Sequence, residues 1–270
     1  MNKLLASCLL AFSISATAKS PCDAFVPYGY PIVTFSSQVL CRTSYLQVHN
    51  NETKTGGVAY EYLTPTTIGT GAEPRTNNFR PDIEVPRASR ASPKEYEGTG
   101  FDKGHLAPAG DMREDGVSMS QSFFMSNMAP QYPNHNRGIW RGLEVLLRNY
   151  VVKQDRNLFV VTGTTFLREP TCLPDATSKD RHTISCKPGD GHVRVPDAYY
   201  KVIIDMNKHD AIAFIIPNQP SGFKKLIDYR VGVCDLEKAV QTVNLFPQAT
   251  PAEKTALCSA DGSTFPTRIN

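Results

Sequence analysis

Long apolar runs are almost absent from this chain of 270 residues. The only marked one, Leu4 to Ile14, is shorter than the roughly 20 apolar residues that a membrane-spanning helix needs, and no later run is long enough. Internal repeats and low-complexity segments are missing too, which excludes a repeat architecture. We therefore expect a soluble globular protein without a membrane partner.

The apolar run has the setting of a signal peptide. It follows Met1-Asn2-Lys3 and leads to Ala16-Thr17-Ala18, which has the small-x-small form that signal peptidase accepts. A lipoprotein signal ending at Cys8 is the alternative, but Cys8 lies inside the apolar run rather than at its end. We expect residues 1–18 to be a signal peptide, residues 19–270 to be a single domain, and the protein to be secreted or periplasmic.

Paired C-x-x-C cysteines are absent as well, so the usual spacing of a zinc site is missing. Loss of Cys8 with the signal leaves six of the seven cysteines, an even number that favours disulfides in an exported protein. The sequence allows several pairings. The least demanding one joins near neighbours: Cys22 with Cys41, Cys172 with Cys186, and Cys234 with Cys258.

Strong charge of either sign is also lacking. The net charge is +3, and it falls to +2 (3 − 1) once Lys3 leaves with the signal, so bulk charge says little about a nucleic-acid partner. The distribution of cations is more informative, because positive potential matters most near a bound phosphate. Basic residues gather on both sides of His105: Arg75, Arg80, Arg87, Arg90, Lys94 and Lys103 before it, and Arg113, Arg137 and Arg141 after it.

The order of secondary structure predicts an α+β fold with a central, mainly antiparallel sheet flanked by helices. Runs rich in β-branched and aromatic residues, bounded by turn formers, predict strands at 45–49, 58–63, 122–126, 158–165, 193–206 and 211–216. Apolar residues at helical spacing predict a long helix from Asn136 to about Val152. Shorter helices are expected at 235–243, capped by Asp235, and at 251–257, where Thr250 begins a capping box.

The segment from Asp102 to Asp111 sets His105 among charges and glycines, and Asn136 and Glu144 follow downstream. A histidine that is neutral near pH 7 accepts a proton from water, and a hard cation held by oxygen ligands stabilises charge that develops on phosphate. The combination therefore favours metal-assisted cleavage of phosphodiesters.

The segments 101–106, 126–131 and 134–140, together with Leu143-Glu144, resemble the DNA/RNA non-specific endonuclease family. This branch of the ββα-metal superfamily holds secreted bacterial nucleases and mitochondrial endonuclease G. The resemblance implies a ββα-metal active-site motif in the sheet protein, one Mg²⁺ that Mn²⁺ could replace, and hydrolysis of DNA and RNA to products with a 5′-phosphate.

The resemblance also implies roles for three residues. His105 is the general base, Asn136 binds the metal through its side-chain oxygen, and Glu144 holds metal-bound waters. Direct coordination by both Asn136 and Glu144 is disfavoured, because eight residues of helix separate them by roughly 12 Å. The alternatives are a hydrogen-bonded core histidine, a helix-capping asparagine and an exposed glutamate.

Three further residues complete the expected catalytic set. Arg75 matches an upstream arginine that would stabilise the phosphate in the transition state, with Arg80 as its competitor. Lys103 stands where the family usually has arginine, which keeps the charge but loses the bidentate fork. Asn127 matches a position near the metal, where it would orient water or substrate; a polar strand end is the alternative.

Two other classes of function stay open from the sequence: a secreted nucleic-acid-binding protein without turnover, and a narrower phosphodiesterase that acts on small substrates. A zinc site at His135 and Asn134 is disfavoured, because no second histidine or cysteine stands at zinc spacing. DNA and RNA are the expected partners, and the sequence does not indicate an oligomeric state.

Overall fold

The structure is a computed structural model that describes residues 20–69, 71–174, 183–187 and 189–266. The expected signal peptide, residues 1–18, lies outside the described residues. Among the described residues, no helix is both long and apolar enough to cross a membrane.

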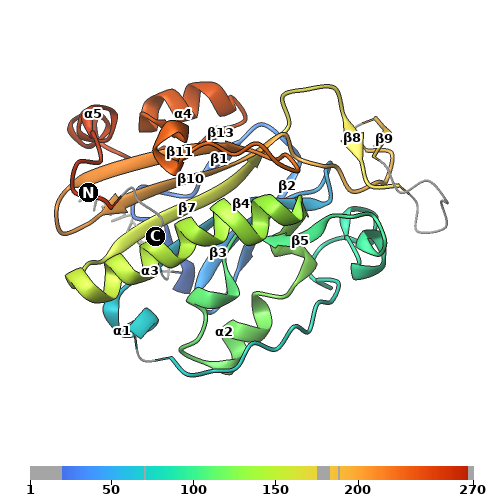
Figure 1. The fold of residues 1–270 in the computed structure, drawn as a ribbon, viewed down its shortest axis with the longest axis horizontal. Helices are drawn as coiled ribbons and strands as arrows, with labels where there is room; N and C mark the ends of the chain where they lie inside the picture. Colours follow the sequence, from blue (N-terminus) through green and yellow to red (C-terminus); the bar gives the residue numbers. More distant parts are fainter. Residues whose placement is uncertain (1–19, 70, 175–182, 188, 267–270) are drawn as a thin grey trace, which may run out of the picture.

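A seven-stranded sheet forms the centre of the fold, and every neighbouring pair in it is antiparallel (Figure 1). This confirms the expected α+β fold with an antiparallel sheet. In spatial order the strands are β12 (Arg230–Val231), β11 (Asp210–Pro217), β10 (Ala198–Asp205), β7 (Leu158–Thr165), β4 (Thr55–Leu63), β3 (Tyr45–Asn50) and β2 (Ser37–Cys41).

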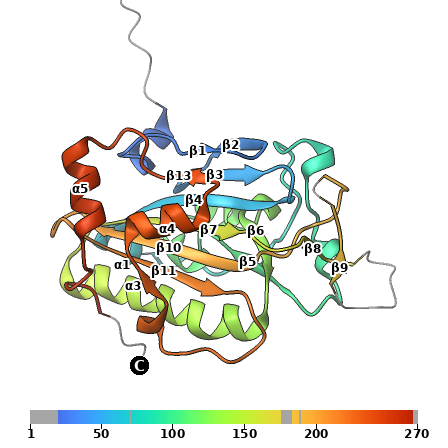
Figure 2. The same cartoon turned by 90° about the horizontal axis from the view of Figure 1, so that it is seen from above.

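Helices cover both faces of this sheet, with α4 (Val233–Val240) and α5 (Pro251–Ser259) above it and α3 (Arg141–Gln154) below it in Figure 1. Each face has its own apolar core, one under α3 and one under α4 and α5. All eight residues of β7 and of β10 are buried, because helices lie over both sides of these strands. The view from above in Figure 2 shows the same layers.

The remaining elements are short. The helices are α1 (Pro65–Gly69) and α2 (Gly116–Gln121), and the strands pair as β1 (Ile32–Val33) with β13 (Val243–Asn244), β5 (Asp102–His105) with β6 (Met128–Gln131), and β8 (Thr171–Cys172) with β9 (Ile184–Ser185).

The strand expected at 122–126 is wrong. Asp115 accepts hydrogen bonds from the backbone of Val117 and Ser118 and so starts α2, and a 3-10 turn, Met125–Asn127, follows that helix. Phe123 and Met125 are fully buried there, but in two separate apolar clusters rather than on one face of a strand. The alternation therefore reflected burial and not extended pairing.

Other boundaries shift for local reasons. The strand expected from residue 193 begins only at Ala198, because residues 193–195 pair with other loops and Pro196 follows. The helix expected at 235–243 is α4, which starts after Gly232; Asp235 lies in its first turn and is not its cap. The capping box at Thr250 is confirmed, with hydrogen bonds to Glu253 in both directions.

The three disulfides join Cys22 with Cys41, Cys172 with Cys186, and Cys234 with Cys258. This is the near-neighbour pairing. The first ties the N-terminal 3-10 turn, Pro21–Phe25, to the edge strand β2, and the third ties α4 to α5. The first bond therefore fixes a peripheral element to the sheet and the third joins the two helices above it, while the second links β8 to the residue that follows β9.

Candidate active site

The strands β5 and β6 form an antiparallel pair in which Gly104 lies opposite Ala129 and His105 opposite Met128. A π-helical turn, His135–Trp140, then leads into α3. Two strands followed by a helix are the ββα arrangement that the resemblance implies. A side chain on Gly104 could not fit, because an added Cβ would lie 2.3 Å from the Gln131 Oε1, so glycine lets Gln131 cross the strand.

His105 ends β5 inside an aromatic box. Its ring packs edge-on against Phe123, with 5.1 Å between centroids, and against Phe79 at 5.7 Å. Burial first, and then the charge of Arg75, lower the pKa of His105 to about 3, against a smaller opposing effect of a hydrogen bond with the Lys103 backbone. Its Nε2 is buried and has no hydrogen-bond partner. The imidazole is therefore neutral at physiological pH, with one nitrogen open to accept a proton.

Asn136 lies inside the π-helical turn, so it is not the helix cap of the alternative interpretation. Its Nδ2 donates to Asp102 Oδ2 at 2.8 Å, and Arg137 donates to both oxygens of Asp102, at 2.8 and 2.6 Å. Asp102 thus fixes which end of the Asn136 amide is the donor, and among the described residues no hydrogen bond is donated to the Asn136 side-chain oxygen. An amide oxygen presented in this way suits a hard cation.

Glu144 lies half-buried in the first turn of α3, within a group of charged residues that the sequence did not reveal. Burial is the largest effect on its pKa and raises it to about 7, although Lys201, Arg148 and Arg75 pull it down; Asp111 acts with burial. Arg148, one helical turn after Glu144, donates to Asp111 Oδ1 at 2.6 Å. The Glu-x-x-x-Arg spacing was the one sequence signal that could have identified Arg148.

Arg75 reaches this group and Arg80 does not. The Arg75 guanidinium lies over the Phe123 ring, 4.8 Å from its centroid, and its charge acts on both His105 and Glu144. Arg80 instead donates to the backbone carbonyls of Asn78 and Ser120 and stacks on Phe124. Geometry therefore favours Arg75 as the cation near the histidine.

Lys103 points into the same aromatic surroundings as His105. Its ammonium lies 5.0 Å from the centroid of Phe79 and 6.0 Å from that of Tyr96. These rings hold a half-buried cation without neutralising it, since a π face attracts charge but carries none. The Lys103 ammonium and the His105 ring thus contact the same Phe79 ring.

Asn127 is completely buried, and its amide is fully engaged with the backbone. The side-chain oxygen accepts from the Ala107 N–H at 2.9 Å, while Nδ2 donates to the carbonyls of Ala107 and Ser122 at 2.8 and 2.9 Å. These bonds tie the segment after His105 to the turn before β6. The geometry gives Asn127 the part of a clamp on the backbone around the histidine.

His135 is a core residue. It is fully buried, packs edge-on against Trp140 and Tyr199, and burial lowers its pKa to about 4. In the described part of the chain, the one cluster with metal-ligand spacing is Cys172, Cys186 and Asp190, whose two cysteines are joined in a disulfide. Neither place offers a zinc site.

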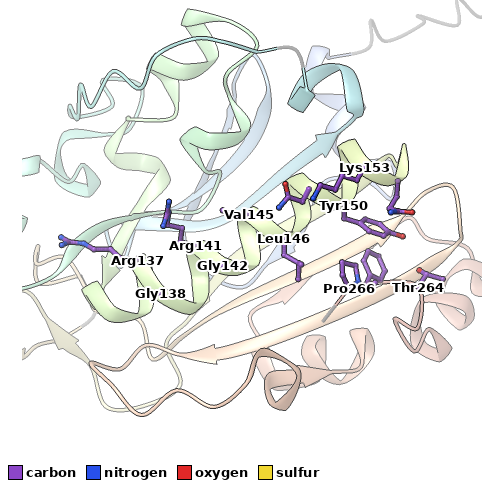
Figure 3. A pocket seen from close by; sticks show the side chains of 13 residues that line it. Arg137, Gly138, Arg141, Gly142, Val145, Leu146, Tyr150, Lys153, Thr264 and Pro266 are labelled. Atoms are coloured by element: carbon purple, nitrogen blue, oxygen red, sulfur yellow. The ribbon is translucent and has the colours of Figure 1, made fainter. Parts of the chain in front are cut away.

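A cavity lies on the outer face of α3 rather than at His105. It measures about 770 Å³ and begins at Arg137, the residue after Asn136 (Figure 3). Figure 3 shows Arg137 and Arg141 at one end and Lys153 at the other, with Leu146 and Pro266 on its apolar side. Among the described residues, none that lines it is acidic. Its cations extend the positive surface away from the histidine.

Known proteins are similar to this chain in sequence and in fold. The chain matches the DNA/RNA non-specific endonuclease family over residues 25–252. It is 35% identical over 205 residues to Nuclease C1 of Cunninghamella echinulata var. echinulata, covering 73% of this chain and 79% of that protein. Identity to the mitochondrial nuclease EXOG of Danio rerio is 34% over 225 residues, or 81% of this chain and 62% of the relative.

Human mitochondrial endonuclease G is 32% identical over 196 residues, which is 72% of this chain and 63% of that protein. The chain thus spans slightly less than two thirds of these two mitochondrial relatives. A solved structure described as the EndoG/EndoGI complex shares the fold, with a TM-score of 0.71 at 24% identity over 88% of this chain and 96% of the other. From the match over residues 25–252, the chain belongs to the DNA/RNA non-specific endonuclease family and is a nuclease.

Proposed function

We propose that the protein is an exported, Mg²⁺-dependent endonuclease that hydrolyses both DNA and RNA, with His105 as general base and Asn136 as metal ligand. The observation that carries this proposal is the buried, unpartnered Nε2 of a neutral His105. A buried nitrogen without a partner is costly to keep in a folded protein, and an incoming water would satisfy it.

The residues present fit a magnesium ion. Asn136 offers an amide oxygen that Asp102 orients, and Glu144 follows on the same helical segment with a carboxylate suited to hold water molecules. Bound there, Mg²⁺ would stabilise the charge that develops on the phosphate and the leaving oxygen. One neutral protein ligand is sufficient, because magnesium keeps several of its waters and substrate phosphate supplies another oxygen.

The residues divide the chemistry between them. His105 takes a proton from water as the water oxygen bonds to phosphorus. The bond from phosphorus to the 3′ oxygen breaks and that oxygen takes up a proton from solvent, which leaves a 3′-hydroxyl and a 5′-phosphate. Arg75 and Lys103 place two positive charges beside the histidine, where the phosphate would lie. Asn127 holds the backbone that positions His105.

Contacts to phosphate rather than to bases would explain action on both nucleic acids. Export rests on the expected signal peptide and on three disulfides, which are typical of oxidising compartments. We further propose that cleavage after Ala18 leaves residues 19–270 as one domain, and that the protein is secreted or periplasmic. N-terminal sequencing of the exported protein should then begin at Lys19.

Cleavage of long substrates tests the proposal. The purified protein should degrade supercoiled plasmid, single-stranded DNA and RNA with Mg²⁺, less with Mn²⁺, and not with chelator. Asn136→Ala should move the Mg²⁺ midpoint of the rate to higher concentration, and Asp102→Asn should do so less, because it only loosens the amide. Hydrolysis confined to small phosphodiesters would establish the narrower activity, and binding without turnover would contradict the proposal.

A further inference from the structure

A lysine is buried in the middle of the sheet, directly under the helix that carries Glu144. Lys201 is only 1% exposed, and in the register of β10 it lies opposite Thr162 of β7 and Phe214 of β11. Its neighbours on the same face of β10, Tyr199 and Ile203, belong to the core under α3. The ammonium therefore lies between the sheet and α3.

The ammonium is held in place without a direct ion pair. Its Nζ donates to the Thr162 hydroxyl, and it lies 5.1 Å from the centroid of the fully buried Trp140 ring at the start of α3. Among the described residues, no carboxylate lies within ion-pair distance of Lys201. Thr162 and Trp140 thus fix the position of the charge from below and from above.

Stability alone does not require this charge. Burying an ammonium without a carboxylate in contact costs desolvation free energy that an apolar side chain of similar length, such as methionine, would not incur. Strand β4, on the far side of β7, adds Glu61, which is 1% exposed and whose two carboxylate oxygens have no hydrogen-bond partner among the described residues. An ammonium in such a place calls for a purpose other than packing.

We propose that Lys201 is a positioning residue of the catalytic centre, whose fixed positive charge keeps the carboxylate of Glu144 ionised and turned toward the waters of the metal site. The proposal rests on the proposed function, because it assigns Lys201 a role only through Glu144.

Geometry supports this assignment first: Trp140, whose ring the ammonium approaches, precedes Glu144 by four residues, so both lie on the same side of the helix. The effect of Lys201 on the pKa of Glu144 is the largest of any charge, ahead of Arg148 on the same helix and Arg75 in the loop, while Asp111 opposes them. Arg148 forms an ion pair with Asp111, which offsets part of its positive charge. On the sheet, Glu61 also feels Lys201, but burial raises the pKa of Glu61 well above its ordinary value, which favours the neutral acid. Lys201 is then left as the counter-charge for Glu144.

The test compares Lys201→Met with the wild-type protein between pH 5 and 9. In the metal-free protein, carbon-13 NMR of the glutamate carboxyls, assigned with Glu144→Gln, should show Glu144 titrating near pH 7. In Lys201→Met this titration should move up by about one pH unit or more, because a nearby positive charge has been lost. With Mg²⁺, the acid limb of kcat should move by the same amount, so that activity falls at least about tenfold at pH 6 and recovers toward pH 9, while KM for DNA stays within about twofold.

Control variants separate charge from packing. Lys201→Arg keeps the charge, so both titrations should stay at the wild-type pH even if the melting temperature falls. Ile203→Val, two residues along the same face of β10, should lower the melting temperature and leave the acid limb unmoved. If Lys201→Met does not fold, Thr162→Val, which removes only the anchor of the ammonium, should give a smaller shift in the same direction.

A folded Lys201→Met or Thr162→Val protein with the wild-type Glu144 titration would overturn the proposal. Absence of Mg²⁺-dependent cleavage by the wild-type protein would instead contradict the proposed function. The NMR titration needs no activity, so these two failures remain distinguishable.

Discussion

At the scale of the residue, the environment of each side chain decides its chemistry. His105 and Glu144 have ordinary pKa values about two units apart. Burial shifts them in opposite directions, so the histidine loses its proton at about pH 3 and the carboxyl near pH 7. At neutral pH the site therefore holds a neutral base, and the acid limb of activity should report Glu144 rather than His105.

His105→Ala should lower single-turnover cleavage by at least about a hundredfold, because a general base acts in the transition state and not in substrate binding. The affinity for DNA in the presence of Ca²⁺ should change little. His209→Asn, in the exposed turn between β10 and β11, is the matched control and should cleave normally. A folded His105→Ala protein with near-normal cleavage would remove the histidine from the mechanism.

Glu61→Gln should raise stability increasingly as pH rises. The folded state keeps the pKa of Glu61 well above 4.5, first because of burial and then because of the charge of Asp111. Above pH 4.5 the unfolded chain therefore releases a proton that the folded protein retains, and Glu61 weakens folding as pH rises. Glutamine removes this penalty. Thermal unfolding should show a gain in melting temperature that is larger at pH 8 than at pH 5.

Glu253→Gln provides the contrast, because hydrogen bonds with Thr250 lower the pKa of this exposed carboxyl. Its loss should lower the melting temperature, and more so at neutral than at acid pH. A gain for Glu61→Gln that did not depend on pH would mean that the carboxyl is ionised in the folded protein as it is in the unfolded chain.

At the scale of the element, the close crossing of β5 and β6 determines where the histidine lies. Gly104 leaves room for the Gln131 side chain, and the Asn127 amide joins the chain after His105 to the chain before β6. Strands β5 and β6 have only four residues each, so the glycine at position 104 and the hydrogen bonds of Asn127 matter more than strand length.

Gly104→Ala should destabilise the protein by about 1–3 kcal/mol, because the added methyl group collides with Gln131. It should also lower activity, and by more than looser packing around His105 would by itself. Urea unfolding and cleavage rates measure the two effects. Gln131→Gly in the same protein should restore part of both losses. No recovery in the double variant would show that the Ala129 carbonyl, 3.1 Å from the added Cβ, is the decisive contact.

At the scale of the whole molecule, two apolar cores and three disulfides hold the layers around the sheet. The disulfides close short loops, with sequence separations of 19, 14 and 24 residues. One face of α3 packs on the sheet, and the other lines the cavity of Figure 3.

Reduction should destabilise the protein markedly, because loops of this length each contribute on the order of 3 kcal/mol in the chain-entropy model. Thiol counting in denaturant checks the pairing: the processed protein should show no free thiol, and a chain that keeps Cys8 should show one. Thermal unfolding with and without reductant measures the loss. Six reactive thiols in exported protein would contradict the disulfides.

The sequence by itself determined the parts of this protein that are encoded locally. Strong β-branched runs predicted most of the long strands, helical periodicity predicted α3, and the family motif predicted His105 and Asn136 as site residues, because each of these patterns is local in the sequence. The motif can be recognised in the sequence without knowledge of the fold. The prediction of a strand at 122–126 was wrong, because a buried aromatic run has the same composition in a turn as in a strand.

Only the tertiary structure decided the electrostatics of the site. Lys201 and Glu61 lie on strands that are far from α3 in the sequence. Their spacing does not indicate that the charges of Lys201, Glu61 and Glu144 act on one another. Asp102 and Asn136 meet through the pairing of β5 and β6 and the turn after it. Coulomb energies and desolvation depend on distance and burial in space, and these exist only once the sheet and helix have packed.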